Sequence, residues 1–405
     1  MPTTIDETSI ATRRLILRDA LAILSLTLAT AVLFAITLFL FRSFSAHRAD
    51  LAQRWSQRGV EALSAHKPGE AIVALRTALT YAPGTPKYEQ LLAQALGEAG
   101  LTDESYQYFM GLWEAEPGNS IINLQLARLA AKRNERAAAV NFYRAAIYGT
   151  WEGDGSVRRP EVRLELARYL MANHDLPSAR LELLTAGGNA PDDYDRDMTI
   201  GQLLEQTEDP ADAFVYYQRA SAARPGDPAA LDAAGRLAYR SGDFEEAHHL
   251  LERAYAEREQ KHESIDSNAD DVTMMDNAAR ILELLPSPTL PVRMRVVRIL
   301  AAQAIARKRF AACSAEFSAK LPPALQALGT RWYGADGTAG ATALLRNPSQ
   351  QDSTMQLVYD TEVQTEKFCA APTGDDALLL ILATTPKLNL QPQAGRLGQP
   401  ITPHD

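Results

Sequence analysis

Cysteine is scarce in this chain, which has only two, Cys313 and Cys369, among 405 residues. Two thiols are too few for a cysteine-rich zinc site or for a fold stabilised mainly by disulfides. Aromatic residues make up only 7% of the sequence, whereas alanine and leucine dominate, which is a composition typical of helices. Positive charge is not in excess either, because the formal net charge is −9. An acidic chain has no global basic field to hold a polyanion, so we expect no nucleic-acid partner.

Motifs of catalysis and cofactor binding are also missing. The sequence has no P-loop, dinucleotide fingerprint or nucleophile elbow. Gly334, Gly337 and Gly340 have a spacing that fits no phosphate-binding loop, and no predicted strand precedes them. His248 and His249 are adjacent, so on a helix their side chains point about 100° apart and cannot easily share a metal. We therefore predict no enzyme activity, no cofactor and no metal site.

One long apolar run stands out in this chain. Residues 20–41 contain 22 residues without a charge or a proline. A helix of that length spans roughly 33 Å, enough for a hydrocarbon core of about 30 Å. The alternative is a cleaved signal peptide, whose apolar region is usually ~7–15 residues long. The length therefore favours a retained single-pass membrane anchor that contacts the lipid bilayer.

The orientation of this anchor is not set by charge, because arginines flank it almost equally on both sides. Long domains translocate largely regardless of such charges. Since the head before the anchor is only residues 1–19, we expect the N-terminus in the cytoplasm. The large C-terminal part would then lie outside, which in a bacterium means the periplasm. Residues 42–51 are expected to form a juxtamembrane helix or linker.

After the anchor, the sequence repeats itself with a step of 34 residues. Proline recurs at this step at Pro83 and Pro117, and again at Pro191 and Pro225. Small residues keep the register in a first series, Gly59, Ala93, Ala127, Ala167, Gly201 and Gly235, and in a second, Ala71, Ser105, Ala139, Ala179, Ala213 and Ala247. Larger residues form a third series, Leu75, Phe109, Tyr143, Leu183, Tyr217 and Leu251.

Each repeat holds two amphipathic, helix-length stretches joined by a short polar turn. Small residues allow two antiparallel helices to approach closely, and we expect the larger residue to fill the gap to the next pair. A single pair leaves an apolar face exposed, so neighbouring pairs must stack on it. Proline after the second helix ends that helix. The pattern predicts an α-solenoid.

This pattern resembles the tetratricopeptide repeat (TPR) family. The first repeat carries the family's residues as Trp55, Gly59, Ala71, Ala78 and Pro83. We identify six repeats in residues 52–259, separated once by an insertion of six residues within 148–159. The insertion either lengthens a surface turn or presents Trp151 to a partner.

Beyond the repeats, residues 260–384 are predicted to form a helical C-terminal region that caps the array. Apolar spacing indicates helices at 272–285, 291–317, 351–368 and 375–383. The tail 385–405 is rich in proline, glycine and glutamine, so we expect it to be disordered. The predicted fold is thus all-α: one transmembrane helix, a TPR α-solenoid of about six helix-turn-helix repeats, and a helical cap.

The oxidation state of the two cysteines depends on the compartment. In the periplasm, Cys313 and Cys369 could form a disulfide between the C-terminal helices. In the cytosol they would stay reduced and pack as small apolar side chains.

The family resemblance implies that the first helix of each repeat lines a concave groove. The residue after the first small position should face this groove, and in three repeats it is an arginine. We predict a partner-binding groove formed by Arg128, Lys132, Arg168, Gln202, Arg236, Tyr239 and Arg240. Arginine holds a carboxylate with two parallel hydrogen bonds, so the groove would suit an acidic or carboxylate-bearing protein segment. The alternative is that these arginines are solvated or pair with neighbouring acids.

The expected function is that of a membrane-anchored adaptor or scaffold for protein–protein interactions at the cell envelope. One alternative is an accessory subunit of a membrane enzyme complex for envelope-polymer or cytochrome maturation. Another is an unrecognised enzymatic activity in the C-terminal helices. Self-association through the stacking faces at the ends of the array also stays open.

Overall fold

The computed structural model describes residues 6–153, 155–188, 192–262, 269–317 and 320–386. The regular elements of these ranges are all helices, and the only β feature in them is one isolated bridge between Asn119 and Thr150. The all-α prediction is confirmed. The chain divides into an N-terminal unit, Met1–Val162, and a C-terminal unit, Arg163–Asp405.

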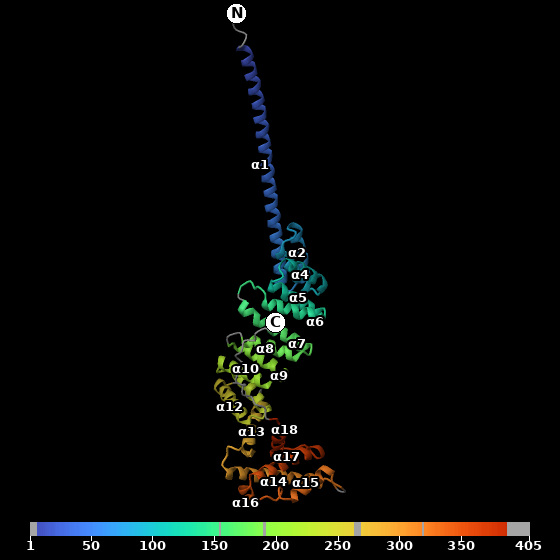
Figure 1. Ribbon diagram of the computed structural model, residues 1–405, viewed down its shortest axis with the longest axis vertical. Helices are drawn as coiled ribbons and strands as arrows, with labels where there is room; N and C mark the ends of the chain where they lie inside the picture. Colours follow the sequence, from blue (N-terminus) through green and yellow to red (C-terminus); the bar gives the residue numbers. More distant parts are fainter. Residues whose placement is uncertain (1–5, 154, 189–191, 263–268, 318–319, 387–405) are drawn as a thin grey trace. The chain divides into compact units, whose positions relative to one another are not determined.

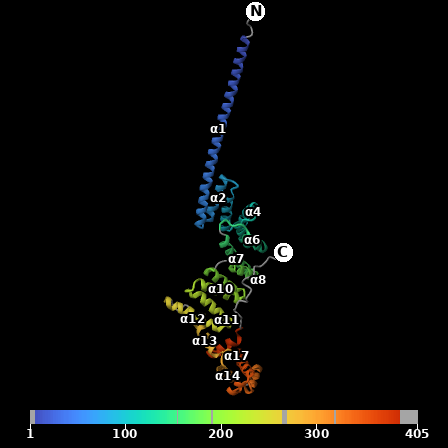
Figure 2. The ribbon, with the colours of Figure 1, turned by 60° about the vertical axis from the view of Figure 1, so that its left-hand side comes forward.

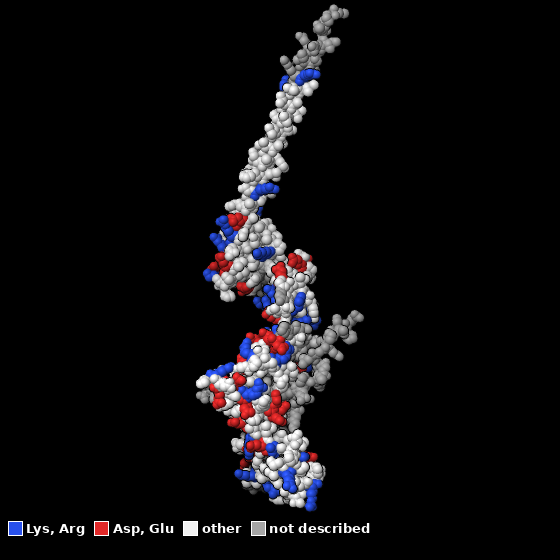
Figure 3. All heavy atoms as spheres, turned by 90° about the vertical axis from the view of Figure 1, so that its left-hand side faces the viewer, with Lys and Arg blue, Asp and Glu red and all other residues white. Residues whose placement is uncertain are grey.

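Helix α1 (Asp6–Ser64) runs without a break from the apolar segment into the first repeat (Figures 1 and 2). Every residue of 20–41 is exposed. Figure 3 shows this uncharged length of α1 between two groups of basic side chains. Among the described residues, α1 is the one helix long and apolar enough to cross a membrane. Residues 42–51 belong to the same helix, so it enters the first repeat directly.

Three helix pairs make up the rest of the N-terminal unit. The helices that follow α1 are α2 (Pro68–Tyr81), α3 (Pro86–Glu98), α4 (Thr102–Ala115), α5 (Ser120–Lys132) and α6 (Arg136–Tyr148). The C-terminal part of α1 packs against α2, α3 against α4, and α5 against α6. Proline starts both α2 and α3, where its missing amide hydrogen would have no helical partner.

Three further pairs belong to the C-terminal unit. The first of their helices, α7, begins before the boundary between the two units and continues past it. They are formed by α7 (Gly155–Ala172), α8 (Leu176–Gly188), α9 (Tyr194–Gln206), α10 (Pro210–Ala223), α11 (Pro228–Arg240) and α12 (Phe244–Lys261). An ion pair of 2.6 Å joins Arg163 on α7 to Glu182 on α8. The described residues therefore contain six helix pairs in the predicted register.

Small and large residues fit together within each pair. A Cβ atom added to Gly201 would lie 2.6 Å from the ring of Tyr217, and one added to Gly235 would lie 2.7 Å from Leu251. We expected the large residue to fill the gap to the next pair. Leu75 does contact that pair, but it also sits directly against Gly59 of its own pair. The small position is therefore set by contact inside the repeat.

The turn inside each repeat contains one residue in the left-handed region, and these residues follow the repeat register. Only two of the six are glycine, although glycine adopts this conformation most readily. The residues are His66, Gly100, Asn134, His174, Glu208 and Gly242, with φ between 55° and 80°.

The insertion between the third and fourth repeats extends the start of α7 and keeps a short connection before it. Thr150 accepts a hydrogen bond from the amide of Ser120 at 3.0 Å, and its own amide donates to Gly118 at 2.8 Å. Trp151 is half-buried, with the Arg158 guanidinium 5.5 Å from its ring centre. The tryptophan thus packs against the start of α7.

Beyond α12, the residues that the structure describes form six helices. They are α13 (Ala269–Leu284), α14 (Val292–Ala315), α15 (Pro323–Tyr333), α16 (Ala341–Arg346), α17 (Pro348–Phe368) and α18 (Asp375–Thr384). All four expected stretches are helical, and α15 and α16 were not expected. Trp332 on α15 stacks on Phe310 and donates a hydrogen bond of 3.1 Å to Thr361. The predicted disorder at 385–405 falls almost entirely outside the described residues.

Candidate partner-binding groove

The first helix of every repeat presents one side chain directly after a buried small residue. The small residues of the first series are all buried between the paired helices. The next residue points away from the pair and is exposed in five repeats and half-buried in the sixth. These residues are Val60, Gln94, Arg128, Arg168, Gln202 and Arg236. The structure therefore gives the predicted positions a common surface orientation within each unit.

In the N-terminal unit, Arg128 and Lys132 lie one turn apart on α5, and both are exposed. Lys132 borders a polar hollow of about 730 Å³ at the repeat turns. Asp103, Glu104 and Glu135 line the same hollow. The lysine therefore faces carboxylates of its own chain.

Arg133, beside Lys132, is held in place by two acidic side chains. Its Nε donates to Glu135 at 2.8 Å, and its guanidinium also pairs with Asp103. The hydrogen bond to Glu135 raises the pKa of Arg133. The same guanidinium lies 4.6 Å from the ring centre of Tyr106. This arginine stabilises the turns and is not presented to a partner.

In the C-terminal unit, Arg168 on α7 and Gln202 on α9 are exposed. Arg168 makes no ion pair with any residue in the described part of the chain. Of the predicted arginines in this unit, it is the one whose guanidinium is left to bind a carboxylate from outside.

The sixth repeat uses its predicted residues differently. Arg236 donates to both carboxylate oxygens of Asp271 on α13, at 3.0 and 2.9 Å. Arg240 pairs with Glu205, which also accepts a hydrogen bond of 2.5 Å from the Tyr217 hydroxyl. In the sixth repeat, both predicted arginines therefore pair with acids of their own chain, as the alternative interpretation of the groove stated.

Tyr239 is also engaged inside the protein. Its ring packs edge-on against Phe244, with centroids 5.3 Å apart, and its hydroxyl is hydrogen-bonded to the side chain of Asn277. Burial raises the pKa of Tyr239. Helix α13 therefore binds the sixth repeat through Asp271 and Asn277, which the repeat pattern could not reveal because α13 lies beyond its register.

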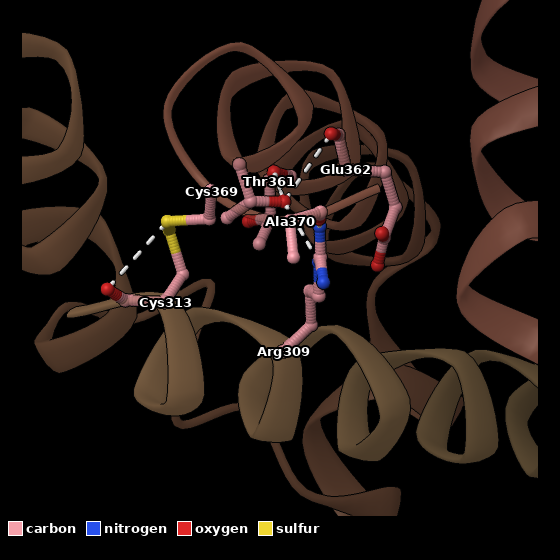
Figure 4. Close-up of a disulfide and its surroundings, with 7 residues drawn as sticks. Arg309, Cys313, Thr361, Glu362, Cys369 and Ala370 are labelled. Carbon is pink, nitrogen blue, oxygen red and sulfur yellow. Dashed lines mark hydrogen bonds between the residues drawn. A yellow bond between two sulfur atoms is a disulfide. The ribbon is translucent and has the colours of Figure 1, made fainter. Parts of the chain in front are cut away.

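The disulfide between Cys313 and Cys369 lies in the C-terminal helices (Figure 4). It joins α14 to the residue that follows α17, with Cα atoms 5.7 Å apart. Arg309, one turn before Cys313, donates to the Thr365 hydroxyl at 3.3 Å and to the carbonyl of Ala370. The end of α17 is thus held to α14 by a covalent bond and by an arginine.

Glu362 on α17 is a buried acid close to this disulfide. It is fully buried, and neither carboxylate oxygen has a hydrogen-bond partner among the described residues. Burial raises the pKa of Glu362 to about 8, and nearby Asp376 adds to this shift. A group so enclosed cannot reach a substrate from solvent.

In the described residues, no three His, Cys, Asp or Glu side chains are grouped so as to hold a metal ion.

Each unit stacks three helix pairs in this register, so the chain has the fold of a tetratricopeptide-repeat α-solenoid, and further helices follow in the C-terminal unit. No protein-family model and no curated protein matches the sequence.

Several solved structures are similar to parts of the chain. The C-terminal part of a TPR repeat-containing protein from Cytophaga hutchinsonii is 12% identical, covers 77% of this chain and 96% of its own, and gives a TM-score of 0.42. The pilF protein of Pseudomonas aeruginosa is 16% identical, with coverages of 56% and 99% and a TM-score of 0.38. YrrB, described as a TPR protein with an unusual peptide-binding site, is 14% identical, with coverages of 51% and 98% and a TM-score of 0.36.

Proposed function

We propose that this protein is a membrane-anchored adaptor that binds a segment of a partner protein along the first helices of its repeats. The observation that carries the proposal is the repeated surface position after each buried small residue. It provides side chains at regular intervals, and three of the six are arginines. An extended peptide has groups at regular intervals too, so a regular series of this kind suits it better than it suits a compact small molecule.

The chemistry of the bound segment follows from the arginines that the fold leaves available. Arg168 is exposed without an acidic partner in the described part of the chain, whereas Arg236 and Arg240 are paired. A carboxylate-bearing segment would therefore bind near Arg168. Arg128, at the equivalent position of α5, is exposed but already interacts within the chain, so a partner would have to compete for it. Arg236 joins the site only if a partner displaces Asp271.

The anchor and the disulfide support a place at the cell envelope. The exposed, uncharged length of α1 suits a lipid environment, because a run of 22 uncharged and mostly apolar side chains in water would be strongly unfavourable. A disulfide persists in an oxidising compartment such as the periplasm. Tethering at the bilayer raises the local concentration of a bound partner, so a modest intrinsic affinity is enough.

Cross-linking and affinity capture from native membranes tests this function. The test variant carries Arg128→Glu and Arg168→Glu, one change in each unit. The matched control carries Arg144→Glu and Arg253→Glu, which alter exposed arginines on the second helices of their repeats. Circular dichroism and membrane fractionation verify folding and insertion of both variants.

One stoichiometric partner that is lost from the test variant and kept by the control would support the adaptor and locate its groove. A partner set that is the same in all three samples would contradict binding through these arginines. If the single dominant partner is a membrane enzyme, the protein is an accessory subunit of that enzyme. We do not propose an activity for the C-terminal helices, because their most perturbed acid, Glu362, is fully buried.

A further inference from the structure

The first repeat has an open stacking face between α1 and α2. A hollow of about 590 Å³ lies there, and its lining includes Trp55, Arg58 and Val73. Val73 is 65% exposed, which is high for an aliphatic side chain on a packed helix pair. The Arg58 guanidinium lies 4.6 Å from the ring centre of Trp55 and forms no ion pair with the residues that the structure describes.

The other repeats show what normally covers this face. In all five of them, the position of Arg58 holds a buried apolar residue, namely Leu92, Leu126, Leu166, Ile200 or Ala234. Leu92 packs with Ile72 and Leu75 of the preceding α2, and Leu126 packs with Phe109 and Leu112 of the preceding α4. The face is therefore shaped to receive helices, and in the first repeat it receives none from the described part of this chain.

The direction of the face follows from the continuity of α1, if α1 crosses the membrane as proposed above. Because α1 has no break, the helices of the first repeat run along the direction in which α1 leaves the bilayer. Transmembrane helices are tilted by only about 20° on average. The stacking face therefore looks sideways, along the membrane plane, toward neighbours in the same bilayer.

A second feature, inside the apolar segment, lies on the same side of α1. Ala22, Ser25 and Ala29 form a stripe of small residues at helical spacing, which favours close approach of two transmembrane helices. The Ser25 hydroxyl donates to the carbonyl of Ala22 at 2.9 Å, so it is satisfied within the helix.

The stripe of small residues lies on the same face of α1 as the residues that line the hollow. Each of its residues lies 36 positions before a residue that lines the hollow, namely Arg58, Glu61 or Ala65. At 3.6 residues per turn, this separation is about ten full turns, so both sets share one face of a straight helix.

We propose that a second copy of this chain covers this face, in a parallel dimer whose two-fold axis runs along the membrane normal. A two-fold contact is made by the same patch on both copies, so the patch must be self-complementary. Face to face, α1 of one copy lies opposite α2 of the other. Arg58 on α1 then faces Glu70 on the opposite α2, which lines the same hollow about one turn farther from the membrane. Among the described residues of its own chain, Glu70 has only an exposed pair with Lys67, which is weak.

Photo-cross-linking of the full chain in native membranes tests the dimer. Two differently tagged copies are co-expressed, with p-benzoylphenylalanine in place of Val73. We expect a product of two chains, in which mass spectrometry joins position 73 of one copy to residues 55–65 of the other. The same label at Leu181, a half-exposed leucine on α8, is the control and should give no such product.

Charge exchange tests the contact between copies. Arg58→Glu alone places glutamates at positions 58 and 70 of both copies, and Glu70→Arg alone places arginines at both positions of both copies. Each single variant should lower the yield of cross-linked dimer about tenfold or more, because like charges repel strongly at an interface. When the two variants are co-expressed, each Glu at position 58 or 70 of one copy faces an Arg of the other copy, and the mixed dimer should return to the wild-type yield.

Three results would overturn the dimer: a cross-link from position 73 to another protein, yields unchanged by either single variant, or no recovery on co-expression. Fractionation separates this failure from that of the proposed function. A membrane-bound chain that stays monomeric contradicts the dimer alone, whereas a chain recovered in the soluble fraction also contradicts the anchor.

Discussion

Arg236 on α11 and Asp271 on α13 form an ion pair in which one guanidinium nitrogen donates to both carboxylate oxygens. The carboxylate is buried and the guanidinium is about half exposed. This contact joins the last repeat to the first helix beyond the array. It also removes one arginine of the predicted groove from competition for an outside ligand.

Asp271→Ala should lower the free energy of unfolding by about 1–2 kcal/mol. Hydrogen bonds to charged groups contribute roughly 1.5–3 kcal/mol, and the exposure of Arg236 reduces this because water can solvate the freed guanidinium. Denaturant unfolding of the full chain in detergent measures the change. Asp270→Ala, at the exposed neighbouring position, is the control and should leave the midpoint unchanged. Equal midpoints for both variants would show that the pair does not hold α13.

The disulfide should stabilise the C-terminal helices strongly. Joining Cys313 to Cys369 closes a loop with a sequence separation of 56 residues. A loop of this length restricts the unfolded chain by about 4 kcal/mol in the chain-entropy model. We expect the double variant Cys313→Ser, Cys369→Ser to expose α14–α18 to limited proteolysis at a temperature where the wild type resists.

A reductant provides the control for this prediction. It should make the wild type as sensitive to protease as the double variant and should not affect the double variant itself. Resistance of the reduced wild type would mean that packing around Arg309 is enough to hold α17 against α14.

The spacing of small and large residues was enough to predict the helix pairs. Three of the small positions, Gly59, Gly201 and Gly235, lie directly against a large side chain of their own pair. The left-handed turns could not be predicted as well, since Gly100, Gly242 and Asn134 are residues that commonly mark such turns, whereas Glu208 is not. The sequence also could not show which arginines of the predicted groove are paired within the chain. Whether Arg236 is available depends on Asp271, 35 residues away on a helix outside the repeat register.

Gly201→Ala should destabilise the fifth repeat although alanine favours helix. The added Cβ would lie 2.6 Å from the ring of Tyr217, which is itself buried and hydrogen-bonded to Glu205. Overpacking of this kind costs about 1–3 kcal/mol. Gly111→Ala on α4 is the matched control, because no atom lies within 4 Å of its added Cβ.

The control variant should be stabilised, by up to about 1 kcal/mol, since alanine replaces glycine in a helix without a clash. Thermal unfolding monitored by circular dichroism compares the two variants with the wild type. Shifts of the same sign in both would contradict the assignment of Gly201 to a contact-limited position.

Glu362 should make the stability of the C-terminal helices depend on pH. Its pKa is raised by burial to about 8, whereas an unfolded glutamate titrates near 4.5. Below pH 4.5, the side chain is protonated in both states and has no effect on the balance. Between pH 4.5 and 8, the unfolded chain loses the proton and the folded chain keeps it. The free energy of unfolding therefore falls as pH rises through this window, by at most about 1.4 kcal/mol per pH unit.

Glu362→Gln removes this titration and keeps the shape of the side chain. The variant should unfold at a higher temperature than the wild type at pH 8, and the difference should disappear at pH 4. Glu366→Gln, at an exposed position one turn further along α17, controls for the loss of one negative charge. A stabilisation that is the same at both pH values would mean that Glu362 is already ionised in the folded protein. Water or Arg309 would then have to solvate the carboxylate, because no hydrogen bond from the described residues does so.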